Sequence, residues 1–103
     1  MNINQLFLSS IFRLKNGDLS VIDNNMIKII NTEIETVLEE KTHNQDQILS
    51  MQLILDISNI LCNNTDIEKL QLEDGVYDFL LDLEDGLYDI LLEEYRKYNS
   101  SYG

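Results

Sequence analysis

The C-terminal third of the chain repeats one eleven-residue phrase, LEDGVYDFLLD followed directly by LEDGLYDILLE, over residues 72–93. Eleven residues make almost three turns of α-helix, so each residue type returns to nearly the same side of the helix. A projection at about 100° per residue separates an apolar stripe from an acidic row. The apolar stripe contains Val76, Phe79, Leu80, Leu83, Leu87, Ile90 and Leu91, and the acidic row contains Asp74, Asp78, Asp82, Asp85, Asp89 and Glu93. The repeat therefore predicts an amphipathic C-terminal helix with its apolar side chains inward and its carboxylates along one outward edge.

The acidic row has no basic neighbours, because residues 73–94 hold nine acids and no Lys or Arg. Like charges four residues apart weaken a helix by about 0.2 to 0.5 kcal/mol per pair, and the row contains four such pairs. The total penalty of roughly 1 to 2 kcal/mol is noticeable against a typical stability of about 5 to 15 kcal/mol. Two interpretations remain open: a solvated face kept charged for solubility, or a recognition surface for a basic partner.

Ile67 and Leu70 are out of phase with the apolar stripe, so we expect the helix to break or bend near residues 71–75. A second interruption is expected at residues 85–86, because glycine costs a helix about 1 kcal/mol relative to alanine. Upstream, the sequence TDIE at 65–68 matches a capping box that starts a helix. Two Asp-Gly pairs also permit a β-meander, but the continuous apolar run FLL at 79–81 breaks the alternation of a strand, so helix is favoured.

The first half of the chain predicts three more helices. Residues 3–15 carry apolar side chains at helical spacing and are followed by Asn16-Gly17, which suits a helix C-terminus. Asn-Gly is also a strong hairpin signal, so a hairpin over residues 11–22 is the alternative, with 18–23 as a connector or short strand. Asp23 or Asn24 caps a second amphipathic helix that ends near Lys41. A third helix over 45–62 is apolar on nearly every side except at Gln52, Asp56 and Asn59, so it belongs in the middle of a bundle.

The composition fits one helical domain over residues 1–103, since 44% of the chain is hydrophobic and the length allows a modest core. We expect an all-α fold, a compact four- to five-helix bundle with an acidic amphipathic C-terminal helix; an α+β fold with the N-terminal hairpin is the alternative. The net charge of −12 is uneven, at +1 over residues 1–32 and −13 over residues 33–103. Such a chain is repelled by nucleic acid and by anionic lipid, so basic proteins are the expected partners.

The sequence carries no recognisable catalytic or metal-binding motif. His43 and Cys62 are the only residues of their types and fall in different predicted elements, so we expect a surface histidine and a buried structural thiol. The glycines do not match a calcium-binding loop, a phosphate-binding loop or a nucleophile elbow. We therefore expect no enzyme activity, no metal and no cofactor. The chain start lacks signal-peptide features, which indicates a cytoplasmic protein, in a host cell if a phage encodes it.

Tyrosines gather near the C-terminus, and all five lie in the last 27 residues. On the projected helix Tyr77, Tyr88 and Tyr95 share one flank, between the apolar stripe and the acidic row. Tyrosine is enriched at protein interfaces, although packing at the edge of a core is the ordinary role for any one of them. Beside an acidic row, three of them predict a docking face or a dimer face.

These observations favour a protein-binding inhibitor over an enzyme. Nine carboxylates over 22 helical residues give one negative charge per roughly 3.7 Å, close to the phosphate spacing of about 3.4 Å along a DNA strand. The absence of alanine and proline with abundant Asn and Ile suggests AT-rich coding DNA, as in certain bacteria or their phages. By analogy of class, we predict an acidic inhibitor that docks on the basic cleft of a nucleic-acid-binding protein, as anti-CRISPR and DNA-mimic proteins do. The alternative is a helical interaction or assembly module, such as an immunity protein or an oligomerising adaptor.

Overall fold

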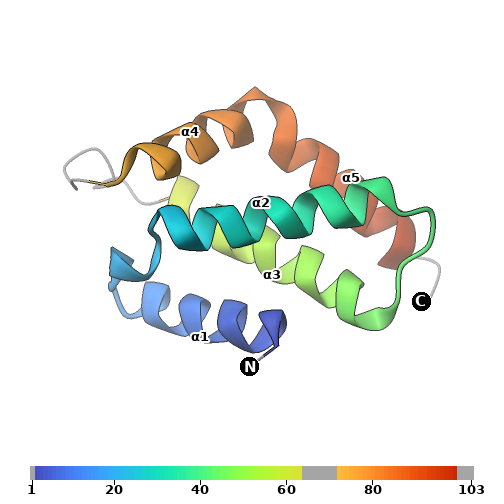
Figure 1. Cartoon of the computed structure of the whole chain (residues 1–103), viewed down its shortest axis with the longest axis horizontal. Coiled ribbons are helices and arrows are strands. Elements are labelled where there is room, and N and C mark those ends of the chain that lie inside the picture. The colour runs from blue at the N-terminus through green and yellow to red at the C-terminus, as the bar shows by residue number, and fades with distance from the viewer. Residues whose placement is uncertain (1, 64–71, 100–103) are drawn as a thin grey trace.

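The computed structural model describes residues 2–63 and 72–99, and every regular element in these two ranges is helical. The chain runs back and forth along the long axis of the molecule in four passes (Figure 1). The first three passes are α1 (Ile3–Lys15), α2 (Asn24–Glu39) and α3 (Gln45–Cys62); the fourth comprises α4 (Asp74–Asp82), the π-helical turn η3 (Leu83–Leu87) and α5 (Tyr88–Asn99). The predicted all-α class is confirmed, and the described ranges contain no strand.

Polar residues just ahead of each of the first three helices explain where these helices begin. Asp23 accepts a hydrogen bond from the backbone N–H of Met26 at 2.8 Å and so caps α2. Asn2 ahead of α1 and Asn44 ahead of α3 each accept a bond from the N–H three residues on, where a glutamine side chain bonds back to the cap. These capping boxes satisfy backbone donors that a helix start leaves unpaired. The predicted starts of the first three helices are confirmed.

The end of α1 decides between the helix and the hairpin predicted for residues 11–22. Gly17 has a φ of 86°, and the N–H groups of Gly17 and Asp18 donate to the carbonyls of Leu14 and Arg13. This pair of bonds is a Schellman motif, which needs a residue with positive φ just past the helix. The hairpin, the short strand and the α+β alternative are therefore wrong, and the connector contains the short 3-10 helix η1 (Leu19–Val21).

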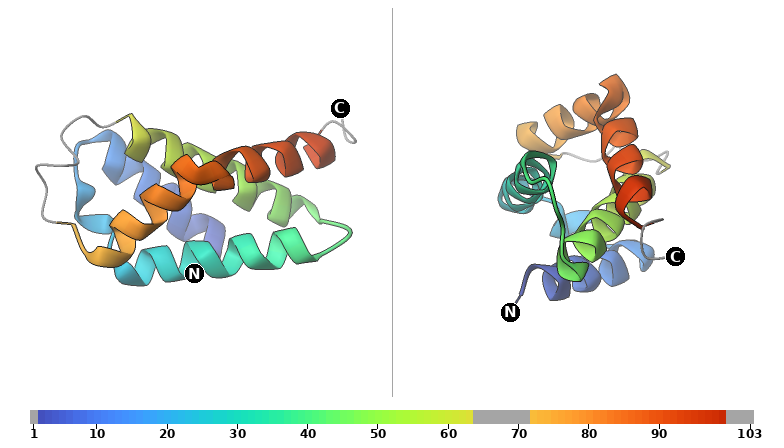
Figure 2. Two further views of the ribbon diagram at one scale, coloured as in Figure 1. Left: turned by 90° about the horizontal axis from the view of Figure 1, so that it is seen from above. Right: turned by 90° about the vertical axis from the view of Figure 1, so that its right-hand side faces the viewer.

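Helix α3 lies in the middle of the molecule, with contacts to all three other passes (Figure 2). Its buried apolar residues point in nearly every direction: Ile48, Met51, Leu53, Ile54, Leu55, Ile57 and Leu61. Ser58 is also buried, and its Oγ donates to the Ile54 carbonyl at 2.8 Å, so the hydroxyl is not left unsatisfied. Gln52, Asp56 and Asn59 remain exposed, which confirms both the central position and the polar strip predicted for this helix.

The fourth pass bends at Gly86, whose φ of 125° lies outside the helical range. The bend confirms the interruption predicted at residues 85–86. The break predicted near residues 71–75 agrees with the start of α4 at Asp74. Residue 71 and the capping box predicted at 65–68 lie outside the described residues. Because the backbone of Gly86 is not helical, the residues after the bend do not have to continue the register of the residues before it.

Burial along the two copies of the repeat shows this change of register. Phe79 of α4 is 1% exposed, whereas Ile90, its counterpart in the second copy, is 54% exposed. Leu80 is half-buried, whereas its counterpart Leu91 is fully buried. The prediction that Ile90 points inward is wrong, because the projection treated the repeat as one unbroken helix.

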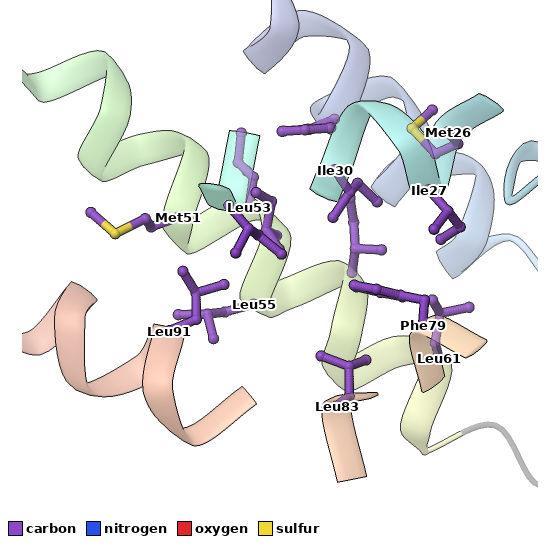
Figure 3. Packing of buried hydrophobic residues seen from close by; sticks show 14 of the residues in the cluster. Met26, Ile27, Ile30, Met51, Leu53, Leu55, Leu61, Phe79, Leu83 and Leu91 are labelled. Carbon is purple, nitrogen blue, oxygen red and sulfur yellow. The ribbon is translucent and has the colours of Figure 1, made fainter. Parts of the chain in front are cut away.

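The two halves of the fourth pass therefore reach the core at different places. In Figure 3, Phe79 of α4 lies near Ile27 of α2, whereas Leu91 of α5 lies against Leu55 in the middle of α3. The buried apolar residues of all four passes nonetheless form one cluster. The radius of gyration of 13.4 Å matches the value of about 13 Å for a compact chain of this size.

The start of α4 is tied to the start of α2 by a pair of hydrogen bonds. The N–H of Gly75 donates to Asn24 Oδ1 at 2.9 Å, and the N–H of Asn24 donates to Glu73 Oε2 at 3.0 Å. A side chain at residue 75 would collide with Asn24, so glycine allows this close approach. The two helices begin side by side and run in the same direction (Figure 1).

Alanine substitution at neighbouring positions tests the change of register. Leu91→Ala should lower the free energy of unfolding by about 2 to 5 kcal/mol, because it leaves a cavity in the core. Ile90→Ala should change it by about 0.5 kcal/mol or less, because that side chain is largely in water. Urea unfolding followed by circular dichroism measures both. Equal losses at the two positions would show that the straight-helix projection was right.

Candidate functional site

All residues of the acidic row are exposed to solvent. Three lie on α4 (Asp74, Asp78 and Asp82), one lies in η3 (Asp85), and two lie on α5 (Asp89 and Glu93). The predicted carboxylates are therefore all available to a partner. The bend at Gly86 decides whether they act as one row.

The bend divides the acidic row between two sides of the fourth pass. Asp78 and Asp82 line a groove between α4 and α2. Asp89 lines a separate hollow, together with Asn59 and Cys62 at the end of α3. The change of register at the bend explains this division, since an unbroken helix would have kept these aspartates on one edge.

Part of the acidic repeat has a local structural reason. Asp74 lies in the first turn of α4 and Asp89 in the first turn of α5, where a negative charge interacts favourably with the helix dipole. The first LEDG phrase (72–75) thus contains the start of α4, and the second (83–86) ends two residues before the start of α5. Asp78 and Asp82 lie beyond the first turn of α4, so the dipole does not account for them.

The α2–α4 groove combines an apolar floor with a charged rim. Ile27 and Phe79 are buried and line it from below, while Asp78, Asp82 and Glu35 contribute exposed carboxylates. Lys28 is the basic side chain among the lining residues, so the groove holds three negative charges and one positive charge. A lysine or arginine of a partner could lay its aliphatic stem on such a floor and its charged head against the carboxylates.

Two of the three predicted tyrosines are engaged with the core of their own molecule. Tyr88 and Tyr95 are partly buried and pack against the core cluster, and the Tyr95 hydroxyl donates to Gln52 Oε1 at 3.4 Å. Tyr77 is half-buried on α4. The tyrosine flank is therefore a less open surface than the acidic row.

Tyr98, which no sequence pattern singles out, connects the end of α5 to the loop between α2 and α3. Its hydroxyl donates to the carbonyl of Lys41 at 2.8 Å, and its ring meets the His43 ring edge-on with centroids 4.2 Å apart. His43 is 6% exposed, so the prediction of a surface histidine is wrong. The polar residues around His43 predict an exposed side chain, but Tyr98 of α5 covers it.

Cys62 also differs from its prediction, because it is exposed rather than buried. His43 precedes the start of α3 and Cys62 ends that helix, so about 27 Å of helix separates them. These two residues therefore do not form a nucleophile pair. Within the described ranges, the acidic, cysteine and histidine side chains form no group of three or more suited to a metal ion.

None of the helices in the described ranges is both long enough and apolar enough to cross a membrane. The chain matches no protein-family model, and comparison with curated proteins and with solved structures finds no significant match.

The spacing of the acids predicts the carboxylates of the candidate site but not their neighbours on α2. Lys28 and Glu35 come from α2, more than forty residues before the aspartates that share their groove. The spacing of the acids contains no signal for this neighbourhood, because it depends on which side of α4 packs against α2.

The chemistry of Cys62 can be predicted from the hollow that it lines. The protein atoms that line this hollow partly desolvate the exposed Cys62 thiol, and this desolvation, followed by the nearby Glu84 carboxylate, raises the pKa of the thiol above its ordinary value. Less thiolate is then present at neutral pH, so the pH midpoint of alkylation by iodoacetamide should lie above that of the chain unfolded in urea. Glu84→Gln should lower this midpoint, whereas Asp56→Asn, which removes a charge elsewhere on α3, should leave it unchanged. A midpoint below that of the unfolded chain would contradict this account.

Alanine at position 86 tests the bend that divides the acidic row. Gly86→Ala should lower the free energy of unfolding by about 1 to 2 kcal/mol, because a Cβ disfavours the positive φ found there. Asp85→Ala, at the preceding exposed position, is the control and should change stability by about 0.5 kcal/mol or less. In an unbroken helix, alanine would instead stabilise by about 1 kcal/mol, so the sign of the effect distinguishes the two geometries.

Proposed function

We propose that this protein is an acidic inhibitor that docks on the basic cleft of a nucleic-acid-binding protein. The observation that carries the proposal is that every carboxylate of the acidic row is solvent-exposed, in a stretch without Lys or Arg. Such a surface attracts a basic cleft from a distance and competes with nucleic acid for it.

The arrangement of the carboxylates supports competition by charge rather than by a close copy of a DNA strand. Along α4, aspartates four residues apart are about 6 Å apart in axial rise, whereas phosphates follow at about 3.4 Å along one strand. The bend then directs Asp89 toward a different side from Asp78 and Asp82. The inhibitor would therefore offer two short acidic patches instead of one continuous line.

The α2–α4 groove is the patch best suited to a specific contact. Asp78 and Asp82 have no role at a helix start, and they share the groove with Glu35 and an apolar floor. Carboxylates above apolar surface suit the long side chains of lysine and arginine, which line nucleic-acid-binding clefts. We assign the first contact with the partner to this groove.

Affinity capture with added nucleic acid tests the proposal. The tagged full chain should retain basic nucleic-acid-binding proteins from a lysate of the source cells at about 0.05 M salt and release much of them by about 0.2 M. Duplex DNA or RNA added to the column should also displace them, because it competes for the same cleft. Captured proteins that nucleic acid does not displace would contradict the proposal.

Paired substitutions locate the contact. Asp78→Asn with Asp82→Asn should weaken binding to the purified partner by about 0.4 to 2 kcal/mol, if each exposed charge contributes about 0.2 to 1 kcal/mol. The control, Glu39→Gln with Asp56→Asn, changes the net charge equally at exposed positions of α2 and α3. If both pairs weaken binding equally, total charge rather than the groove carries the interaction.

A further inference from the structure

Helix α1 exposes apolar side chains on the side of the molecule opposite the acidic row. Phe12 is 69% exposed and Leu8 is 52% exposed, and their spacing of four residues places them on one face. Figure 1 and the right-hand view of Figure 2 place α1 at one edge of the molecule and α4 and α5 at the other. This face is therefore distinct from the surface assigned to the inhibitor function.

Helix α3, which packs against α1, carries one more exposed apolar side chain at a similar level along the bundle. The side-chain amide of Asn4 donates to the Asp46 carbonyl at 3.1 Å, which holds the N-terminal ends of α1 and α3 together. Leu49, one turn into α3, is 38% exposed and lies within about one helical turn of the level of Leu8. Leu8, Phe12 and Leu49 together expose apolar area on the order of 300 Å².

The charge of this face differs from that of the rest of the chain. Residues 1–17 contain no acid and two bases, whereas residues 18–103 carry a net charge of −14. Arg13 is paired with Asp18 at 2.6 Å, and hydrogen bonds from Ser20 and then from Arg13 hold the pKa of Asp18 below its ordinary value. The Arg13 charge is thereby balanced within one molecule, and Lys15 is the remaining charge of α1.

We propose that this face binds a second copy of the chain, with the two α1 helices antiparallel across a twofold axis. Two copies that approach through any acidic surface repel each other, whereas the α1 faces are apolar and almost neutral. A twofold arrangement places the same residues on both sides of the contact, so Leu8 of each copy meets Phe12 of the other. The apolar stripe of α4 and α5 is not available for this role, since Phe79, Leu83 and Leu91 are buried within one molecule.

The antiparallel arrangement also pairs the remaining charges. With the axis between Leu8 and Phe12, the two Lys15 side chains lie about 15 Å apart along the helices, beyond the screening length of about 8 Å at physiological salt. Each Lys15 lies instead near the level of Gln5 of the second copy, close to its exposed Asp46. Each such pair offsets a single charge, so the repulsion between two chains of net charge −12 still dominates the salt dependence of the contact.

The available area predicts a weak dimer. A standard stable interface buries about 800 Å² per partner, more than twice the apolar area of this face. The flanking polar residues of α1 and α3 must supply the remainder, so we expect dissociation in the micromolar range or weaker. A weak dimer would present two acidic α4–α5 surfaces facing away from each other.

Sedimentation of the full chain over a range of protein and salt concentrations tests the dimer. The dimer should be seen below about 1 mM protein and should tighten as salt rises from about 0.05 to 0.5 M, because salt screens the repulsion between two chains of charge −12. A monomer throughout this range overturns the proposal. So does association that weakens with salt, which is the signature of an acidic surface binding a basic one.

Matched substitutions place the contact on α1. Phe12→Gln should weaken the dimer about tenfold or more, and Leu8→Gln provides a second, independent variant. Leu81→Gln is the control, because Leu81 is 57% exposed on α4, on the opposite side of the molecule. Circular dichroism confirms that each variant is folded. An equal effect of Phe12→Gln and Leu81→Gln overturns the assignment to α1.

Discussion

Helix α3 is apolar on nearly every side, and the burial of that surface constrains where the other helices can lie. An isolated helix of this kind would expose apolar side chains all round, so stable folding requires neighbours on each side. Helix α1, helix α2 and the fourth pass supply them, and each contacts α3. The amphipathic helices cover a central apolar one, and their polar faces form the outer surface.

The fourth pass covers α3 and α2 together, which explains the bend at Gly86. Its first half reaches the core through Phe79 beside α2, and its second half reaches it through Leu91 beside α3. A straight helix would direct all its apolar side chains to one side, whereas the bend at Gly86 lets α4 pack against α2 and α5 pack against α3. The glycine of the second LEDG phrase permits the positive φ that this turn requires.

The bend also determines the form of the candidate site. The repeat places acids at regular intervals, but after the rotation those of α4 border α2 and Asp89 borders the end of α3. The molecule is then polarised, with carboxylates at the edge formed by α4 and α5 and an almost neutral apolar face on α1. The two proposed contacts use these two surfaces separately, a basic partner on the carboxylates and a second copy of the chain on α1.

The sequence by itself determined the local structure of this protein. Capping residues such as Asp23 and Asn44, the C-cap glycine at 17 and the apolar periodicity of residues 24–39 act within a few residues of one another, so helix starts and ends are readable from the chain. The central position of α3 and the exposure of the acidic row could also be predicted, because apolar side chains are buried and charged ones stay in water. The break at residues 85–86 was readable as a weak point, since glycine is unfavourable in any helix.

Only the tertiary structure decided the direction in which the chain continues after that weak point. The register of α5, and with it the exposure of Ile90, depends on which residues face α3 across the core. The burial of His43 depends in the same way on Tyr98, 55 residues later in the chain. The α2–α4 groove likewise joins residues that are distant in sequence. Periodicity describes one helix at a time, whereas these features arise from packing between helices, which a single-helix projection does not contain.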